Sequence, residues 1–313
     1  MNRKINYLLT GVLLVLLAGL KPAFAQTRLL SEQELDTTTV YYSVEAALQQ
    51  KDQVYRLNIR QQNYYSFTPD LCELVNLQFI NAMKNKIAEL APEINQLQNL
   101  QEINLQENLL KDLPDSFFKL GELRVLNLSH NQFTDLTAGF DQLQKLETLQ
   151  LNENKIRTIS PQVKKMKELH TLNLNYNQLE TLPSQFGKMR NLQSLSVTQN
   201  QLRDLPTGFF QLKHLQNLSL DFNQLEVLPG EIKNLKQLTT LLLGHNALKN
   251  LPPQLNQLQN LQLLDLSYNK LTALPPALSE LKNLRTLLLI GNNLPENEKS
   301  RLRQELPQTD IRF

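Results

Sequence analysis

The chain has 313 residues, of which 32 are basic, 30 are acidic and one is cysteine. A single cysteine excludes a fold held by disulfide bonds, because small exported domains build such frameworks from even numbers of cysteines. Arg3, Lys4 and Lys21 lie in an N-terminal segment that we expect to be removed, which leaves 29 basic against 30 acidic residues. This balance gives no electrostatic reason to expect nucleic acid or an anionic membrane as a partner.

Residues 1–25 have the three-part pattern of a signal peptide. The basic end Asn2-Arg3-Lys4 precedes an apolar run from Tyr7 to Leu20, and Ala23-Phe24-Ala25 has the small-x-small form of a cleavage site. The run is shorter than the roughly 20 apolar residues that a membrane-spanning helix needs, although an uncleaved anchor is the alternative. We therefore expect cleavage after Ala25, no membrane span in the mature protein, and a secreted or periplasmic location.

Residues 26–53 are expected to form a linker and an N-terminal cap. Thr37 to Tyr42 is rich in β-branched and aromatic residues, which favours an edge strand. Ser43 is a favourable helix N-cap, and the residues after it place Val44, Ala47 and Leu48 on one face of a short helix. A cap is needed because a first repeat has no neighbour to cover its core. The alternative is that Tyr41 and Tyr42 form a binding site.

Residues 54–294 repeat a 23-residue pattern, giving ten full repeats and one partial repeat. The repeats start at Val54, Leu77, Leu100, Leu123, Leu146, Leu169, Leu192, Leu215, Leu238, Leu261 and Leu284. In each repeat, positions 1, 4, 6, 11, 14, 18 and 21 are predominantly apolar. The alternation Leu264-Asp265-Leu266 has the period of a β-strand, and Leu274-Pro275 ends it because proline has no N–H. This periodicity predicts a solenoid, in which each repeat covers the apolar face of its neighbour.

Position 9 is asparagine in every repeat except the first, which has Gln62. A buried polar side chain must be hydrogen-bonded, and asparagine offers both donors and an acceptor to the backbone of adjacent repeats. The sequence therefore predicts a structural asparagine ladder made of Asn85, Asn108, Asn131, Asn154, Asn177, Asn200, Asn223, Asn246, Asn269 and Asn292.

The pattern LxxLxLxxNxLxxLPxxLxxLxx resembles the leucine-rich-repeat family, in particular its 23-residue Leu-Pro subclass, which occurs in Ras-pathway scaffolds, their plant relatives and many bacterial proteins. The resemblance covers Val54 to about Leu294. It implies an α/β, β-rich solenoid: a right-handed horseshoe with a concave parallel sheet and a convex side of irregular segments or short helical turns. With one strand per repeat, the ten full repeats and the partial one predict eleven strands in this sheet. The family binds partners of every kind, so the resemblance does not name one.

Residues 295–313 are expected to form a C-terminal cap. Pro295 to Leu306 has proline near its start, acidic residues early, and Leu302 and Leu306 four residues apart, which together predict a helix. The tail supplies Ile311 and Phe313 to cover the last repeat.

Catalytic signatures are lacking in the sequence, which has no HExxH, GxSxG, GxxxxGK[ST] or GxGxxG motif. His130 and His245 both occupy position 8, but five strand spacings separate them by about 24 Å, too far to bind one metal. His170 and His214 are interpreted as solvated residues of the convex side or an edge, and Cys72 as a small structural residue rather than a reactive thiol. We expect no enzyme activity, no cofactor and no metal.

Positions 3, 5, 7 and 8 flank the buried strand residues and should project from the concave sheet. In the second half of the array these positions hold aromatic and apolar side chains, which are typical of protein-binding hot spots. The alternative is that they are tolerated apolar substitutions on an ordinary surface. Arg56, Arg60, Lys84 and Lys86 form a smaller basic patch, interpreted as solvated charge. The predicted partner-binding residues are Tyr176, Phe222, His245, Tyr268, Leu242, Leu263 and Leu288.

The sequence thus predicts a monomeric, exported, non-enzymatic scaffold that binds a protein partner on its concave face. One alternative is recognition of a glycan or cell-envelope polymer through the amide- and hydroxyl-rich first half together with the same aromatic residues. Another is a host-directed effector without a catalytic domain.

Overall fold

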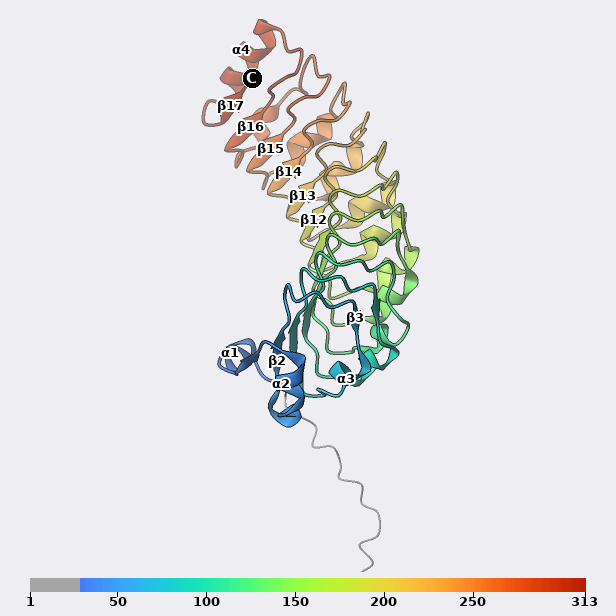
Figure 1. Cartoon of the computed structure of the whole chain (residues 1–313). Coiled ribbons are helices and arrows are strands. Elements are labelled where there is room, and N and C mark those ends of the chain that lie inside the picture. Colours follow the sequence, from blue (N-terminus) through green and yellow to red (C-terminus); the bar gives the residue numbers. More distant parts are fainter. Residues whose placement is uncertain (1–28) are drawn as a thin grey trace, which may run out of the picture.

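The computed structural model describes residues 29–313. The predicted signal peptide and the start of the linker lie outside this part. From Val54 onward the chain winds into consecutive coils, which stack into a curved array with strands on the inner side and short helices on the outer side (Figure 1). The predicted leucine-rich-repeat solenoid is therefore confirmed.

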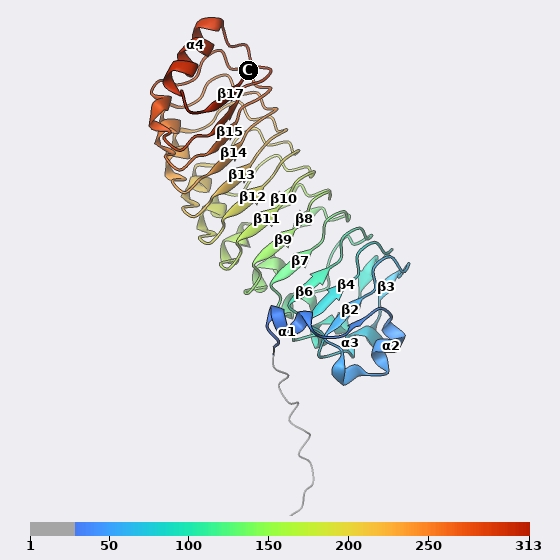
Figure 2. The ribbon, with the colours of Figure 1, turned by 90° about the vertical axis from the view of Figure 1, so that its left-hand side faces the viewer.

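The inner side is one parallel sheet of 13 strands, following one another along the array (Figure 2). Each repeat contributes positions 3–5, and Leu172 pairs with Leu149 and Leu195, one repeat away on either side. The expected number of eleven was too low, because each cap adds a strand at one edge. The strands are β1 (Val40–Tyr41), β2 (Arg56–Asn58), β4 (Phe79–Asn81), β6 (Glu102–Asn104), β7 (Val125–Asn127), β9 (Thr148–Gln150), β11 (Thr171–Asn173), β12 (Ser194–Ser196), β13 (Asn217–Ser219), β14 (Thr240–Leu242), β15 (Leu263–Asp265), β16 (Thr286–Leu288) and β17 (Asp310–Arg312).

The outer side consists of short helical segments, one in each of the first ten repeats. Most are single 3₁₀ segments of three to five residues, the usual length for this helix type. A proline at the N-cap or first position of many of them presets the backbone for the turn. The segments are α3 (Pro69–Cys72), η2 (Pro92–Gln96), η3 (Phe117–Lys119), η4 (Ala138–Gln142), η5 (Pro161–Lys165), η6 (Ser184–Lys188), η7 (Thr207–Gln211), η8 (Gly230–Asn234), η9 (Pro253–Gln257) and η10 (Leu278–Glu280).

Two additional two-stranded sheets lie at positions 13 and 14 in the N-terminal half. They pair β3 (Ser66–Phe67) with β5 (Glu89–Leu90), and β8 (Asp135–Leu136) with β10 (Thr158–Ile159). Each is extended by an N–H at position 15, where Ala91 donates to Phe67 (2.9 Å) and Ser160 to Leu136 (2.8 Å). The repeats from Leu169 to Leu261 all have proline at position 15. Proline cannot make this hydrogen bond, so the outer ladder ends where these prolines begin.

The core is continuous along the array. In the repeat that starts at Leu261, all seven apolar positions are buried, and the same positions carry most of the buried leucines in the other repeats. Each coil contributes one layer to this core, so no repeat has a complete core of its own.

The position-9 asparagines lie beside this core and hydrogen-bond to it. Asn177 Oδ1 accepts the N–H of Ile156 at 2.9 Å, and its Nδ2 donates to the carbonyl oxygens of Leu151 (2.9 Å) and Leu174 (3.0 Å). The ten asparagines repeat this arrangement with small variations at the first one. In the first repeat, Gln62 instead donates to the Tyr42 carbonyl of the cap at 2.7 Å.

The N-terminal cap contains α1 (Glu32–Asp36), β1, α2 (Val44–Leu48) and η1 (Lys51–Gln53). The strand and the Ser43-capped helix occur where the sequence predicts them, and Ala47 is buried. Helix α1 was not predicted. It starts with a capping box between Ser31 and Glu34, and Arg56 of β2 donates to the Asp36 carbonyl at its end (3.0 Å), so α1 lies against the start of the inner sheet.

The C-terminal cap is α4 (Glu296–Glu305) followed by β17. Leu302 and Leu306 are buried as predicted, and Ile311 and Phe313 pack against the core. Within residues 29–313, no helix combines the length and the apolar character needed to cross a bilayer.

Candidate functional site

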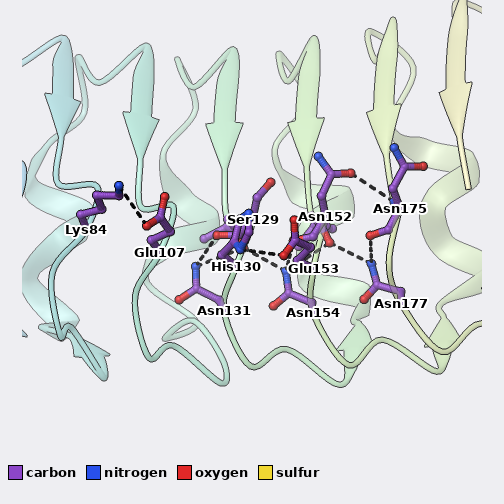
Figure 3. Close-up of polar contacts among 12 residues, drawn as sticks. Lys84, Glu107, Ser129, His130, Asn131, Asn152, Glu153, Asn154, Asn175 and Asn177 are labelled. Carbon is purple, nitrogen blue, oxygen red and sulfur yellow. Dashed lines mark hydrogen bonds and ion pairs between the residues drawn. The ribbon is translucent and has the colours of Figure 1, made fainter. Parts of the chain in front are cut away.

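Position 8 follows each inner strand and has a left-handed backbone in all eleven repeats. Its φ angles lie between +52° and +59° at the ten non-glycine residues, and Gly291 has +73°. The turn is supported by the position-5 side chain, because Asn81 Oδ1 accepts the Met83 N–H (3.1 Å) and Asp265 Oδ1 accepts the Ser267 N–H (2.8 Å). The repeated turn aligns the position-8 side chains in one row along the inner side (Figure 3).

The N-terminal half of this row contains two pairs of polar side chains. Lys84 Nζ lies 3.5 Å from Glu107 Oε2, and His130 Nδ1 lies 2.9 Å from Glu153 Oε2 (Figure 3). Each pair joins adjacent repeats, so these side chains largely satisfy one another.

The C-terminal half of the row carries a stack of three aromatic rings. The ring centroids of Phe222 and His245 are 4.0 Å apart with planes at 10°, and those of His245 and Tyr268 are 4.3 Å apart at 17°. Phe222 and Tyr268 remain 48% and 51% exposed. At the next repeat Gly291 leaves space for the Tyr268 ring, since a Cβ there would lie 2.6 Å from it. We call Phe222, His245 and Tyr268 the ring stack.

The structure groups six of the seven predicted partner-binding residues. Leu242, Leu263 and Leu288 are half-buried in the strands beside the ring stack. Tyr176 is exposed but stands two repeats away from Phe222, with Gln199 between them. The aromatic row is therefore interrupted, and the compact surface belongs to the repeats that start at Leu215, Leu238, Leu261 and Leu284.

Two carboxylates that the sequence analysis did not select lie on this same surface. Asp221 Oδ1 accepts the Gly244 N–H at 2.9 Å, and Asp265 accepts the Ser267 N–H. A Cβ on Gly244 would meet Asp221 Oδ1 at 3.2 Å and Asp265 Oδ2 at 3.4 Å, so the two side chains face each other across this glycine. Among residues 29–313, neither carboxylate forms an ion pair.

The negative charge of Asp221 is not required for its structural role. At the same repeat position, Asn152 and Asn175 also accept the position-7 N–H of the next repeat, from Asn175 (3.1 Å) and Thr198 (2.8 Å). An amide oxygen therefore makes this hydrogen bond as well as a carboxylate does. What the aspartate adds is a charge facing the concave surface.

Burial raises the pKa of Asp221, and the nearby Asp265 carboxylate acts in the same direction. The folded protein therefore holds this proton at pH values where the unfolded chain has released it, so stability declines as the pH rises from about 3.9 through the folded pKa. We expect Asp221→Asn to flatten this decline and to raise the free energy of unfolding at pH 7 by about 0.5 kcal/mol. Urea unfolding at several pH values checks this, with exposed Asp115→Asn as the control. A slope unchanged from wild type would contradict it.

The basic residues near the N-terminal end are largely engaged within the protein. Arg56 bonds to the end of α1 and lies over the Phe79 ring, and Lys86 lies over Tyr65. Burial, with the α1 carboxylates, raises the pKa of Glu102 on the adjoining strand. The start of the concave face is thus occupied by the cap and by internal pairs.

Catalytic chemistry has no visible support in the described residues. Cys72 is fully buried in α3, and burial raises the pKa of its thiol to about 12, which disfavours the thiolate needed for a nucleophile. Within residues 29–313, no group of three His, Cys, Asp or Glu side chains could hold a metal ion.

Family comparisons match the repeats along their whole length. The chain matches the families described as Leucine-rich repeat region (residues 53–181), Leucine rich repeat (190–248 and 236–294) and Leucine Rich repeats (2 copies) (167–210). No curated protein matches it.

Several solved structures are similar to the chain. A leucine-rich-repeat protein of Leptospira interrogans is 28% identical with a TM-score of 0.52, over 88% of this chain and 100% of that one. An internalin of Listeria monocytogenes is 23% identical with a TM-score of 0.69, over 90% and 88%, and shows the fold alone. A plant peptide hormone receptor in complex with RGF2 is 27% identical with a TM-score of 0.63, and the match covers 77% of this chain but 43% of the receptor.

Proposed function

The chain belongs to the leucine-rich-repeat family, and from this premise we propose that it is a non-enzymatic scaffold that binds a protein partner on the concave face of its last four repeats. The observation that carries the proposal is the ring stack, which exposes about half of Phe222 and Tyr268 on a solvated sheet. Exposed aromatic residues at the centre of a patch are the side chains that dominate protein interfaces.

The ring stack is well suited to binding because it is already ordered. Stacking holds the three rings against one another, and the left-handed turns that carry them belong to the rigid repeat backbone. A partner that docks here loses little additional side-chain entropy from this protein, so a few anchors suffice. In contrast, the polar position-8 side chains Lys84, Glu107, His130 and Glu153 of the first half are paired with one another.

The carboxylates beside the ring stack indicate the chemistry of the partner. Asp221 and Asp265 form no ion pair within the described residues, and their carboxylates flank Gly244, which has no side chain between them. A Lys or Arg side chain placed over Gly244 would contact both carboxylates and the edge of the ring stack, combining charge pairing with cation–π attraction. The partner is therefore a protein or peptide segment that carries a basic side chain next to apolar ones.

The plant receptor supports a protein ligand in general terms, since it was solved in complex with RGF2. Glycan recognition by the polar first half is less favoured, because several of its asparagine oxygens already accept backbone N–H groups, as Asn104 does from Gln106 (3.0 Å) and Asn127 from Ser129 (3.0 Å). No observation favours the host-directed effector.

Site-specific photo-crosslinking tests the proposal. A photoreactive residue at Thr240, beside the ring stack in β14, should capture a protein from native cell-envelope or medium fractions, and the captured peptide should carry Lys or Arg. The same probe at exposed Lys233 of η8, on the outer side, is the matched control. Equal capture from both positions, or none from Thr240, would remove the support for a concave binding site.

Export of the protein is part of the proposal, with the leader of residues 1–25 as its basis. We expect the mature protein to begin at Gln26, because the small residues Ala23 and Ala25 fit the signal-peptidase pocket. N-terminal sequencing of the protein from the periplasm or medium checks this. Ala25→Arg should block cleavage and retain the leader, and processing of this variant at the wild-type site would contradict the assignment.

A further inference from the structure

A second surface, away from the concave face, is a groove along one edge of the array. It has a volume of about 1230 Å³ and is formed by positions 19–23 of three consecutive repeats, where each outer helix ends and the chain turns toward the next strand. Its basic lining residues are Lys164, Lys165, Lys167, Lys188, Arg190 and Lys213.

The groove concentrates positive charge. Six of its residues are Lys or Arg, and Glu168 is its only carboxylate. Lys165 pairs with Asp141 at 2.9 Å, whereas the other five cations form no ion pair within residues 29–313. A hollow lined by unpaired charge of one sign focuses the electrostatic field and attracts ligands of the opposite charge.

The cations follow the repeat. Lys167, Arg190 and Lys213 all occupy position 22 of successive repeats, and Lys236 occupies the same position in the repeat after them. All four are exposed. The array therefore presents one cation per coil along a line, which matches a linear ligand with charge at regular intervals.

The walls of the groove are held at a fixed separation. Helices η6 and η7 pack so closely that a Cβ on Gly187 would collide with the carbonyl oxygen of Gly208, and one on Gly208 would lie 2.5 Å from the Ser184 carbonyl oxygen. These are backbone contacts, which cannot move aside as a side chain can. The groove is therefore preformed, and binding requires little ordering of the protein.

The lining excludes two classes of polyanion. It has no Phe, Tyr or Trp side chain on which successive nucleic-acid bases could stack, and no apolar side chain to receive the anchors of an acidic protein segment. Asn191, Gln211 and His214 add hydrogen-bonding groups between the cations, which suit hydroxyl groups. We propose that this groove binds an anionic polysaccharide.

Affinity measurements with heparin and polygalacturonate, a sulfated and a carboxylated polysaccharide, test this inference. The triple variant Lys167→Glu/Arg190→Glu/Lys213→Glu should bind both at least about tenfold more weakly than the wild-type protein, and wild-type binding should weaken as salt rises. Lys111→Glu/Lys155→Glu/Lys249→Glu makes the same change in net charge at exposed positions outside the groove, and should keep its affinity within about twofold. Thermal unfolding verifies that both variants are folded.

Further outcomes decide the ligand class. Neutral dextran should not bind, and Phe222→Ala should bind the polysaccharides as wild type does, because the ring stack lies on a different surface. Equal weakening by the two triple variants would show that only net charge matters and would overturn the proposal. Polyglutamate or duplex DNA competing as well as the polysaccharides at matched charge would also overturn it.

Discussion

Asn177→Ala is expected to lower the free energy of unfolding by about 3 kcal/mol, the upper range for a single substitution. The side chain is 7% exposed and makes one accepted and two strong donated hydrogen bonds to the backbone of its own and the preceding repeat. Alanine leaves the Ile156 N–H buried without a partner and removes one of the two hydrogen bonds of the Leu151 carbonyl, which keeps the one from Asn154 Nδ2 at 3.1 Å. It also leaves a small cavity that the neighbouring side chains cannot fill completely, which lowers stability further.

Urea unfolding followed by circular dichroism measures this change, with Asn250→Ala as the matched control. Asn250 is exposed and makes no hydrogen bond within residues 29–313, so its substitution should change stability by less than about 0.5 kcal/mol. Hydrogen exchange should localise the Asn177→Ala effect to the repeats around it, because each repeat contacts only its neighbours. If Asn177→Ala lowers stability no more than the control does, the asparagine ladder makes no measurable contribution to the free energy of unfolding.

Phe222→Ala and Tyr268→Ala are each expected to weaken partner binding about 10- to 100-fold, or about 1.4 to 2.7 kcal/mol. Each removes an exposed ring, and each also leaves His245 without one of its two stacking neighbours. The double variant should lose less binding free energy than the sum of the two single variants, because each single substitution already loosens His245, the ring between them. Calorimetry or surface plasmon resonance with the partner identified by crosslinking gives these values.

Val227→Ala is the control for this series, since Val227 is 65% exposed and lies outside the concave row. It should leave binding unchanged, and all variants should unfold within about 1 kcal/mol of wild type. Tyr176→Ala separates two models of the surface. A loss as large as that of Phe222→Ala would extend the site across Gln199, whereas a small loss confines it to the last four repeats.

Periodicity made most of the fold predictable, because one rule of spacing is applied eleven times. The strand positions, the buried leucines, α2 and α4 follow from this pattern and from ordinary capping residues such as Ser43 and Pro295. The repeat pattern did not predict α1, whose local signal is the capping box between Ser31 and Glu34. Its place against the sheet depends on Arg56, which lies 20 residues away from Asp36 along the chain. The outer two-stranded sheets occur where position 15 is not proline, at Ala91 and Ser160. The N–H groups of these two residues extend the outer sheets, a role that follows only from the observed strand pairing.

The sequence predicts which residues lie on the concave face, but not which of their side chains contact one another. Phe222, His245 and Tyr268 share a repeat position, yet face-to-face stacking depends on the left-handed turn, and only Gly291 hints at that turn in the sequence. Asp221 and Asp265 occupy different repeat positions and converge through the register of β13 to β15. The edge groove was not predictable from the total charge, which is nearly neutral although Lys167, Arg190 and Lys213 form a local excess of positive charge.

The position-15 prolines also divide the array mechanically. Four of the first five repeats have outer β-bridges in addition to the inner sheet, the exception being the repeat that starts at Leu100 and has Pro114 at position 15, whereas from Leu169 onward the outer segments are joined without such a ladder. Spreading the outer rim of the later coils therefore breaks no outer β-ladder, and the inner sheet acts as the hinge line. We expect the curvature of the C-terminal half to be the softer elastic mode, so the arc can tighten or relax around a docked molecule while its N-terminal half keeps its shape.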